Sequence, residues 1–225
     1  MDINTTDRAL LRLLQLSSVS LPVGGYAFSQ GLEYAIDQGW IKNQAQVEDW
    51  TSLQLMQSFA RVDLPILRLA MTAWATRDHA RMVELNDLAL ACRETKELRL
   101  NDSAMGEALA RLLRSLEIDT PFSKAEEVSF TILFAIAASD WNIEFDTAAL
   151  GFTWSWLENQ IAAATKLVPL GQTQAQVLFG TLQPVLTEAI QLSKTLDEDD
   201  VGAGLPAVAI ASCLHETQYS RLFRS

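Results

Sequence analysis

The chain has 225 residues and a formal net charge of −11, from 28 acidic and 17 basic side chains. This charge repels nucleic acid and anionic membranes, so neither is expected as a partner. Hydrophobic residues make up 49% of the sequence and charged residues 20%, which is typical of a globular protein with a sizeable core and excludes a disordered one.

Targeting signals and disulfides are not expected. The first thirty residues contain no basic stretch followed by an apolar run and a cleavage site. No stretch reaches the roughly 18 unbroken apolar residues that a membrane-spanning helix needs. Cys92 and Cys213 are far apart, and neither their number nor their spacing indicates a disulfide framework. These features predict a protein of the reducing cytoplasm.

Apolar residues recur with the period of an α-helix along almost the whole chain. Leu109, Leu112, Leu113 and Leu116, for example, follow the spacing that gives one apolar stripe. No run of β-branched residues alternates between hairpin turns, which argues against a sheet. We therefore expect an all-α fold, a single-domain bundle of about eight to ten helices over residues 1–225.

Caps, glycines and prolines set the expected helix boundaries. In chain order, the predicted helices are Thr6 or Asp7 to about Leu16, Ser29–Gln38, about Gln44–Trp74, Asp78–Cys92, Glu94–Leu116, Ser123–Trp141, Phe145–Lys166, Gln172–Lys194 and Pro206–Leu214. Gly39 is expected just beyond the end of the second of these helices. Gly106, inside a predicted helix, is expected to allow close packing.

Three local patterns carry more specific predictions. Pro65 lies inside the longest predicted helix, so either Asp63 caps a new helix there or the helix is kinked. Ser123 and Glu126 have the spacing of a capping box, which predicts a helix that begins at Ser123. The acidic run Asp197–Asp200 predicts an exposed loop.

The stretch SVSLPVGGYAFSQGLE, residues 18–33, is a glycine-rich segment ahead of a predicted helix, where phosphate-binding loops are found. Its glycines have the wrong spacing for a P-loop, and Glu33 would repel a phosphate. No strand precedes it, which excludes a dinucleotide-binding loop. We expect a fixed turn that presents Tyr26 to a partner and places Phe28 in the core.

Few residues offer catalytic or metal-binding chemistry. The histidines are His79 and His215, and Cys213 lies close to the second. Positions i and i+2 of a helix diverge by about 200°, so we interpret Cys213 as packed and His215 as a surface residue. A weak ligand role in an irregular tail is the alternative. No motif of a known enzyme class occurs, so we expect no catalysis and no tightly bound cofactor.

Two segments combine interface chemistry with a structural interpretation. Lys166, among apolar residues near the end of its helix, either complements the helix dipole or faces a partner. The closing ETQYSRLFRS is either a frayed end or an anchor in which Arg221 and Arg224 flank Leu222 and Phe223.

Four segments, taken in order, resemble the family of the urease accessory protein UreF. They are LLQLSSVSLPVGGYAFSQGLEYAIDQGWI, RETKELRLNDSAMG, WLENQIAAATKLVPLGQTQAQ and YSRLFRS, which extend from the first predicted helix to the last residue. The resemblance implies an all-α homodimer without catalysis of its own. Proteins of that family join the D-type accessory protein UreD, called UreH in some organisms, and recruit the nickel-carrying GTPase UreG.

The resemblance also implies a process and a set of contacts. The assembly delivers nickel to apo-urease, whose active-site lysine is carbamylated, and UreF couples GTPase turnover to this delivery and helps to form a nickel passage. The loop around Tyr26–Gln30 and the predicted helix Phe145–Lys166 are expected to contact UreG. The tail at about 216–225 is expected to become ordered against UreD. The expected partner contacts are Tyr26, Ser29, Gln30, Glu33, Trp154, Glu158, Lys166, Arg221, Leu222, Phe223 and Arg224.

Two other functions are alternatives to an adaptor. The first is a metallochaperone that itself carries nickel, whereas the adaptor leaves the ion to the assembled complex, where a few oxygen ligands pass it without holding it. The second is a GTPase-activating protein that inserts Arg221 or Arg224 beside the nucleotide.

Overall fold

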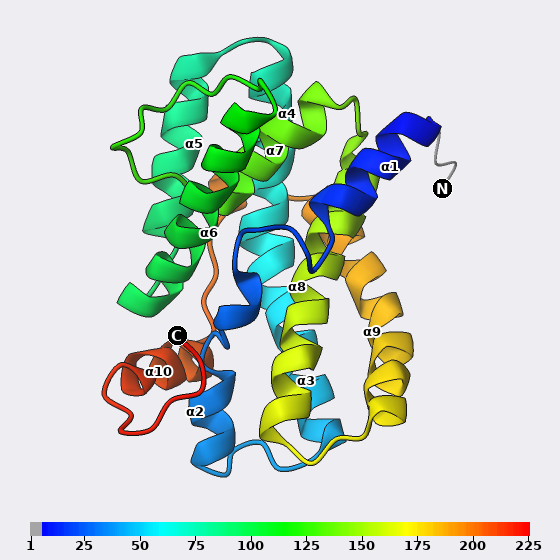
Figure 1. Ribbon diagram of the computed structural model, residues 1–225, viewed down its shortest axis with the longest axis vertical. Coiled ribbons are helices and arrows are strands. Elements are labelled where there is room, and N and C mark those ends of the chain that lie inside the picture. Colours follow the sequence, from blue (N-terminus) through cyan, green and yellow to red (C-terminus); the bar gives the residue numbers. More distant parts are fainter. Residues whose placement is uncertain (1–5) are drawn as a thin grey trace.

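The computed structural model describes residues 6–225, and every regular element in that part of the chain is helical (Figure 1). The α-helices are α1 (Asp7–Leu16), α2 (Leu32–Asp37), α3 (Gln44–Gln54), α4 (Leu64–Ala75), α5 (His79–Ala91), α6 (Lys96–Ser115), α7 (Phe130–Asp140), α8 (Phe145–Leu167), α9 (Gln172–Ser193) and α10 (Pro206–His215). The all-α prediction is confirmed. None of these helices is long and apolar enough to cross a membrane.

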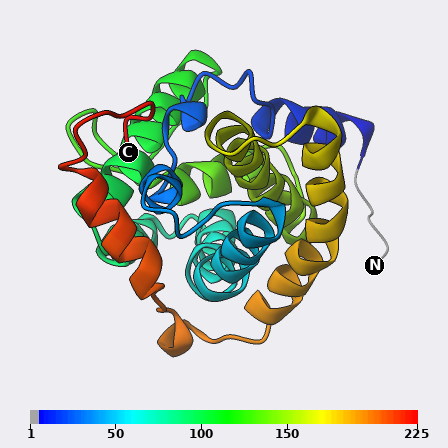
Figure 2. The same ribbon diagram turned by 90° about the horizontal axis from the view of Figure 1, so that it is seen from below.

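Helix α7 lies at the centre of one end of the molecule. Every residue from Phe130 to Ala138 is buried. A helix that is apolar on all sides must be covered on all sides, and α4, α5 and α6 pack around it. At the other end, α8 and α9 pack together, and α10 contacts α2. Helices α3 and α4 follow one another in one long helical rod. Seen from below, this rod lies in the middle, between α9 and α10 (Figure 2).

The rod is continuous because a π-helical segment, η2 (Leu55–Asp63), joins α3 to α4. Pro65 has no N–H for the carbonyl of Arg61, four residues earlier. The N–H of Gly202 donates to that carbonyl instead, at 3.2 Å. Asp63 has helical backbone angles and makes no cap, so the predicted cap is wrong. Its carboxylate pairs with Arg93 instead.

The predicted helix start at Ser123 is also wrong, since α7 begins at Phe130. The N–H of Ser123 does bond to Glu126, but within a turn. Asp102 of α6 accepts hydrogen bonds from the N–H of Phe130 at 2.9 Å and from the hydroxyl of Ser129 at 3.1 Å. Ser129 is the N-cap of α7, because its hydroxyl also accepts from the N–H of Thr131 at 3.2 Å. Asp102 supports this cap from another helix, and the local capping box has no such support.

Backbone angles explain why the second predicted helix begins later than expected. The helix predicted from Ser29 begins only at Leu32, because Gln30 and Gly31 have φ angles of 53° and 83°, which an α-helix cannot contain. Gly39 follows α2 with a φ of 72°, as predicted. The acidic run is exposed, as predicted, and contains the 3₁₀ turn η3 (Glu198–Asp200).

Candidate functional site

The C-terminal tail is docked against the glycine-rich loop, and the frayed alternative is wrong for this structure. The N–H of Arg224 donates to the carbonyl of Ala27 at 2.8 Å. An oxygen of Ser225 accepts from the N–H groups of Ser29, at 2.5 Å, and Gln30, at 3.3 Å. The C-terminus therefore lies beside α10 and α2 (Figure 1).

A cluster of polar side chains lies beneath the tail, in which Glu33, Glu97 and His215 are buried and Arg221 is 39% exposed. His215 of α10 bridges two carboxylates: Nδ1 lies 2.8 Å from Glu97 of α6, and Nε2 lies 3.0 Å from Glu33 of α2. Arg221 of the tail donates to the other oxygen of Glu97 at 3.1 Å. We call Glu33, Glu97, His215 and Arg221 the latch cluster.

The latch cluster corrects one sequence interpretation. His215 is completely buried and Cys213 is exposed, the reverse of the prediction. Cys213 and His215 do face different directions, as expected for positions i and i+2 of a helix. The partners of His215 are 182 and 118 positions away in the chain, so no local pattern could have found them.

Above the cluster, apolar side chains of the loop and the tail reach solvent. Tyr26 is 64% exposed, as predicted, and Leu222 is 63% exposed. Phe28, as predicted, and Phe223 are buried. The loop therefore buries Phe28 and exposes Tyr26, and the tail buries Phe223 and exposes Leu222.

Cations gather at the same place. The Nζ of Lys166 lies 5.4 Å from the ring centre of Phe223, and the Cζ of Arg224 lies 5.9 Å from that of Phe28. Cations over aromatic faces are stabilised by the ring quadrupole. We call the exposed side chains Tyr26, Lys166, Arg221, Leu222 and Arg224 the tail–loop surface. Lys166 contacts the tail, an arrangement that neither sequence interpretation included.

Four other residues were expected to contact a partner, namely Ser29, Gln30, Glu33 and Trp154. Ser29 and Glu33 are buried, so neither is exposed on this surface. Gln30 accepts a hydrogen bond from the indole N–H of Trp156 at 2.7 Å, a contact that sequence reasoning missed. Trp154 faces elsewhere, where its ring stacks on Phe179 of α9 with centres 5.1 Å apart.

Glu158, also on α8, is half-buried. Burial raises its pKa above the ordinary value for a glutamate. It makes no ion pair or hydrogen bond within residues 6–225.

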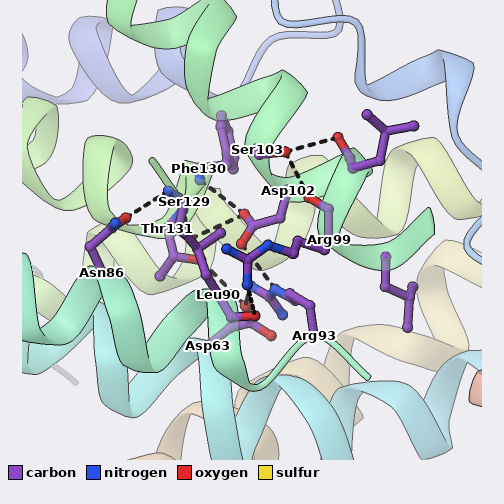
Figure 3. A network of polar contacts seen from close by, with 12 residues as sticks. Asp63, Asn86, Leu90, Arg93, Arg99, Asp102, Ser103, Ser129, Phe130 and Thr131 are labelled. Atoms are coloured by element: carbon purple, nitrogen blue, oxygen red, sulfur yellow. Dashed lines mark hydrogen bonds and ion pairs between the residues drawn. The ribbon is translucent and has the colours of Figure 1, made fainter. Parts of the chain in front are cut away.

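Deeper inside, a second ionic network joins η2, α6 and the start of α7 (Figure 3). Arg93 lies between Asp63, at 2.6 Å, and Asp102, at 2.9 Å. These carboxylates raise the pKa of Arg93 further, against the opposing effect of burial. Thr131 donates to Asp63 at 3.3 Å. Both carboxylates of this network are paired with Arg93, so it is best explained as a structural element.

A cavity of about 110 Å³, lined by both polar and apolar side chains, lies beside this network, between η2, α6 and α8. The side-chain oxygens of Asn101 and Gln160 are buried in its wall without a hydrogen-bond partner among the described residues. Residues 6–225 contain no group of three or more His, Cys, Asp or Glu side chains arranged to hold a metal ion.

Comparison with known proteins gives the family. A family model described as UreF matches residues 41–183. A protein of Marinomonas sp. (strain MWYL1), named urease accessory protein UreF, is 70% identical over 224 residues, which cover 100% of this chain and 97% of that protein. This chain belongs to the UreF family.

Other relatives of the same name agree. The UreF of Hahella chejuensis is 47% identical, with 96% of this chain and 98% of that protein covered. The UreF of Alkalilimnicola ehrlichii is 46% identical, with 95% of each chain covered. The UreF family model ends before the tail, but the Marinomonas match extends across the loop, the tail and the latch cluster.

Proposed function

We propose that this UreF-family chain is a non-enzymatic adaptor required for maturation of the urease nickel centre. It bridges the D-type (H-type) accessory protein and the GTPase UreG, and modulates GTPase-coupled nickel delivery to apo-urease. It acts in the cytoplasm as a homodimer, and nickel is handled by the assembled complex rather than by a tightly bound site in this chain.

One observation carries the proposal beyond family membership. The loop and Lys166, which the resemblance assigns to UreG, and the tail, which it assigns to UreD, form one continuous tail–loop surface. An adaptor needs adjoining contacts for its partners. Exposed apolar side chains flanked by arginines are the chemistry that protein interfaces favour.

The test is capture of UreD and UreG from the same organism by the tagged chain. Loss of residues 220–225 should abolish three-way assembly, because it removes Leu222 and both arginines. Since that deletion also removes buried Phe223, the sharper variant is Leu222→Ser, which changes only an exposed side chain. We expect it to weaken capture at least about tenfold, as for a central interface residue.

Val177→Ser is the matched control, because Val177 is 50% exposed on α9, away from the tail. It should capture both partners normally. Capture that survives both the deletion and Leu222→Ser would refute the role of the tail.

Equilibrium dialysis with nickel distinguishes the adaptor from a metallochaperone. Tight one-to-one nickel binding by the isolated chain would favour that alternative. Weak binding by the chain, with retention of nickel by the assembly, is the result expected of an adaptor.

A further inference from the structure

The cavity between η2, α6 and α8 has a more polar wall than the interior of a helical bundle requires. Its apolar part includes the rings of Phe59, Phe152 and Trp156. Its polar part includes the amide and hydroxyl side chains of Gln54, Ser58, Asn101, Ser155, Asn159 and Gln160. The cavity volume is about 110 Å³. One water molecule needs only about 10–15 Å³, so there is room for several.

The π-helical winding of η2 builds one side of this wall. Gln54, at the end of α3, and Asp63, at the end of η2, both line the cavity. On an α-helix, two positions so far apart would point about 180° away from each other. In η2 the N–H of Leu64 donates to the carbonyl of Phe59, five residues back. This winding takes more residues per turn, so Gln54 and Asp63 reach the same side.

Two amide oxygens in the wall are deeply buried and unpaired. Asn101 is 6% exposed and Gln160 is 2% exposed. Neither side-chain oxygen has a hydrogen-bond partner within residues 6–225. A buried polar group without a partner is destabilising, and the great majority of such groups are hydrogen-bonded. Two unpaired oxygens beside one cavity therefore indicate a hydrogen-bond donor inside it.

The chemistry of the wall identifies that donor. A side-chain amide carries both an acceptor oxygen and a donor nitrogen, so a ligand that satisfies two amides must donate and accept. The carboxylates in the same wall, Asp63 and Asp102, are already paired with Arg93. Water is the smallest neutral molecule with both functions. Buried waters typically make about three hydrogen bonds to groups that are otherwise unpaired.

We propose that this cavity is a binding site for a cluster of ordered water molecules. The cluster links the amide of Asn101 on α6 to the amide of Gln160 on α8, and completes the interior where the central rod faces both helices. This inference goes beyond the proposed function and does not depend on it.

A high-resolution crystal structure of the isolated full-length chain is the direct test. We expect water oxygens within about 3.2 Å of the side-chain oxygens of Asn101 and Gln160. Crystals held under xenon provide the counter-test, because a dry apolar cavity takes up xenon and a hydrated polar one does not. Xenon in this cavity, or no water at either amide oxygen, would overturn the proposal.

Gln160→Met keeps the length of the side chain and removes both of its hydrogen-bonding functions. Gln176→Met, at an exposed position on α9, is the matched control. If the oxygen of Gln160 is bonded to water, Gln160→Met should melt at or below the temperature of the control. An oxygen with no partner at all would make its removal stabilising. A melting temperature above that of the control would therefore overturn the proposal.

A second variant covers the case in which Gln160→Met fails to fold. Asn101→Ser shortens the side chain and keeps a hydroxyl, which enlarges a polar site without adding bulk. We expect one further ordered water in the space that the amide leaves. A crystal structure of Asn101→Ser with no water in that space would contradict the proposal.

Nickel soaked into the same crystals, and located by its anomalous scattering, tests the other occupant. Water retained in the cavity, with any nickel bound elsewhere, is the expected result. A nickel ion bonded to the oxygen of Asn101 or Gln160 would overturn the water assignment and would favour the metallochaperone. Failure of the chain to capture UreD and UreG would refute the proposed function, and would leave the water cluster unaffected.

Discussion

Glu158 is a half-buried carboxylate on α8 whose pKa is raised by burial. An acid with a higher pKa in the folded than in the unfolded state stabilises the fold when protonated. That stability is present below the ordinary glutamate pKa near 4 and is lost as the pH rises through the raised pKa. At neutral pH, the ionised group therefore opposes folding. A residue kept at some expense in stability is a candidate for a functional role.

We expect Glu158→Gln to raise the melting temperature at pH 7, because the neutral amide avoids the desolvation of a charge. The gain should disappear near pH 3.5, where the native carboxyl is protonated. Thermal unfolding of both proteins across this pH range is the measurement. Glu188→Gln on the exposed face of α9 should show no such gain. A gain that persists at low pH would show that charge burial is not the cause.

At the scale of elements, α6 meets the start of α7 at Gly106. A Cβ added there would lie 1.9 Å from the carbonyl oxygen of Val128 and 3.1 Å from the N of Phe130. Backbone cannot move aside as a flexible side chain can. The expectation from sequence that Gly106 allows close packing is confirmed.

Gly106→Ala should therefore lower the free energy of unfolding by at least about 2 kcal/mol, despite the higher helix propensity of alanine. Chemical denaturation measures this change. Gly180→Ala in α9 is the matched control, because no atom lies within 4 Å of its added Cβ. It should raise the free energy of unfolding by about 0.5–1 kcal/mol. Equal signs for the two substitutions would contradict the packing argument.

At the scale of the whole molecule, Arg93 ties the central rod to α6 and the start of α7 (Figure 3). Its partners Asp63 and Asp102 are both buried. A buried guanidinium between two carboxylates cannot be removed without leaving two uncompensated negative charges.

Arg93→Met should lower the free energy of unfolding by about 3–5 kcal/mol, measured by chemical denaturation. Arg99→Met provides the comparison, since Arg99 pairs with Glu127 at the surface of the molecule. Its loss should be below about 1 kcal/mol. Similar losses for both variants would mean that the inner network contributes no more than a surface ion pair.

The sequence predicted most of the helices, since periodicity and caps are local. It failed where a distant side chain decides the outcome. Asp102 supports the N-cap Ser129 of α7 from another helix, so the capping box at Ser123 misplaced the start of α7. His215 was placed on the surface because its two carboxylate partners could not be identified from sequence spacing. Tyr26 was placed correctly, because the turn around it is set by neighbouring residues.

Sequence by itself determined the fold class, the family resemblance and the residue types of the tail. These follow from helical periodicity, composition and short segments, each of which is read along the chain. Only the tertiary structure placed the tail against the loop and buried Glu33 beneath it. Those contacts join α2, α6, α10 and the tail, and their geometry exists only once the helices have packed.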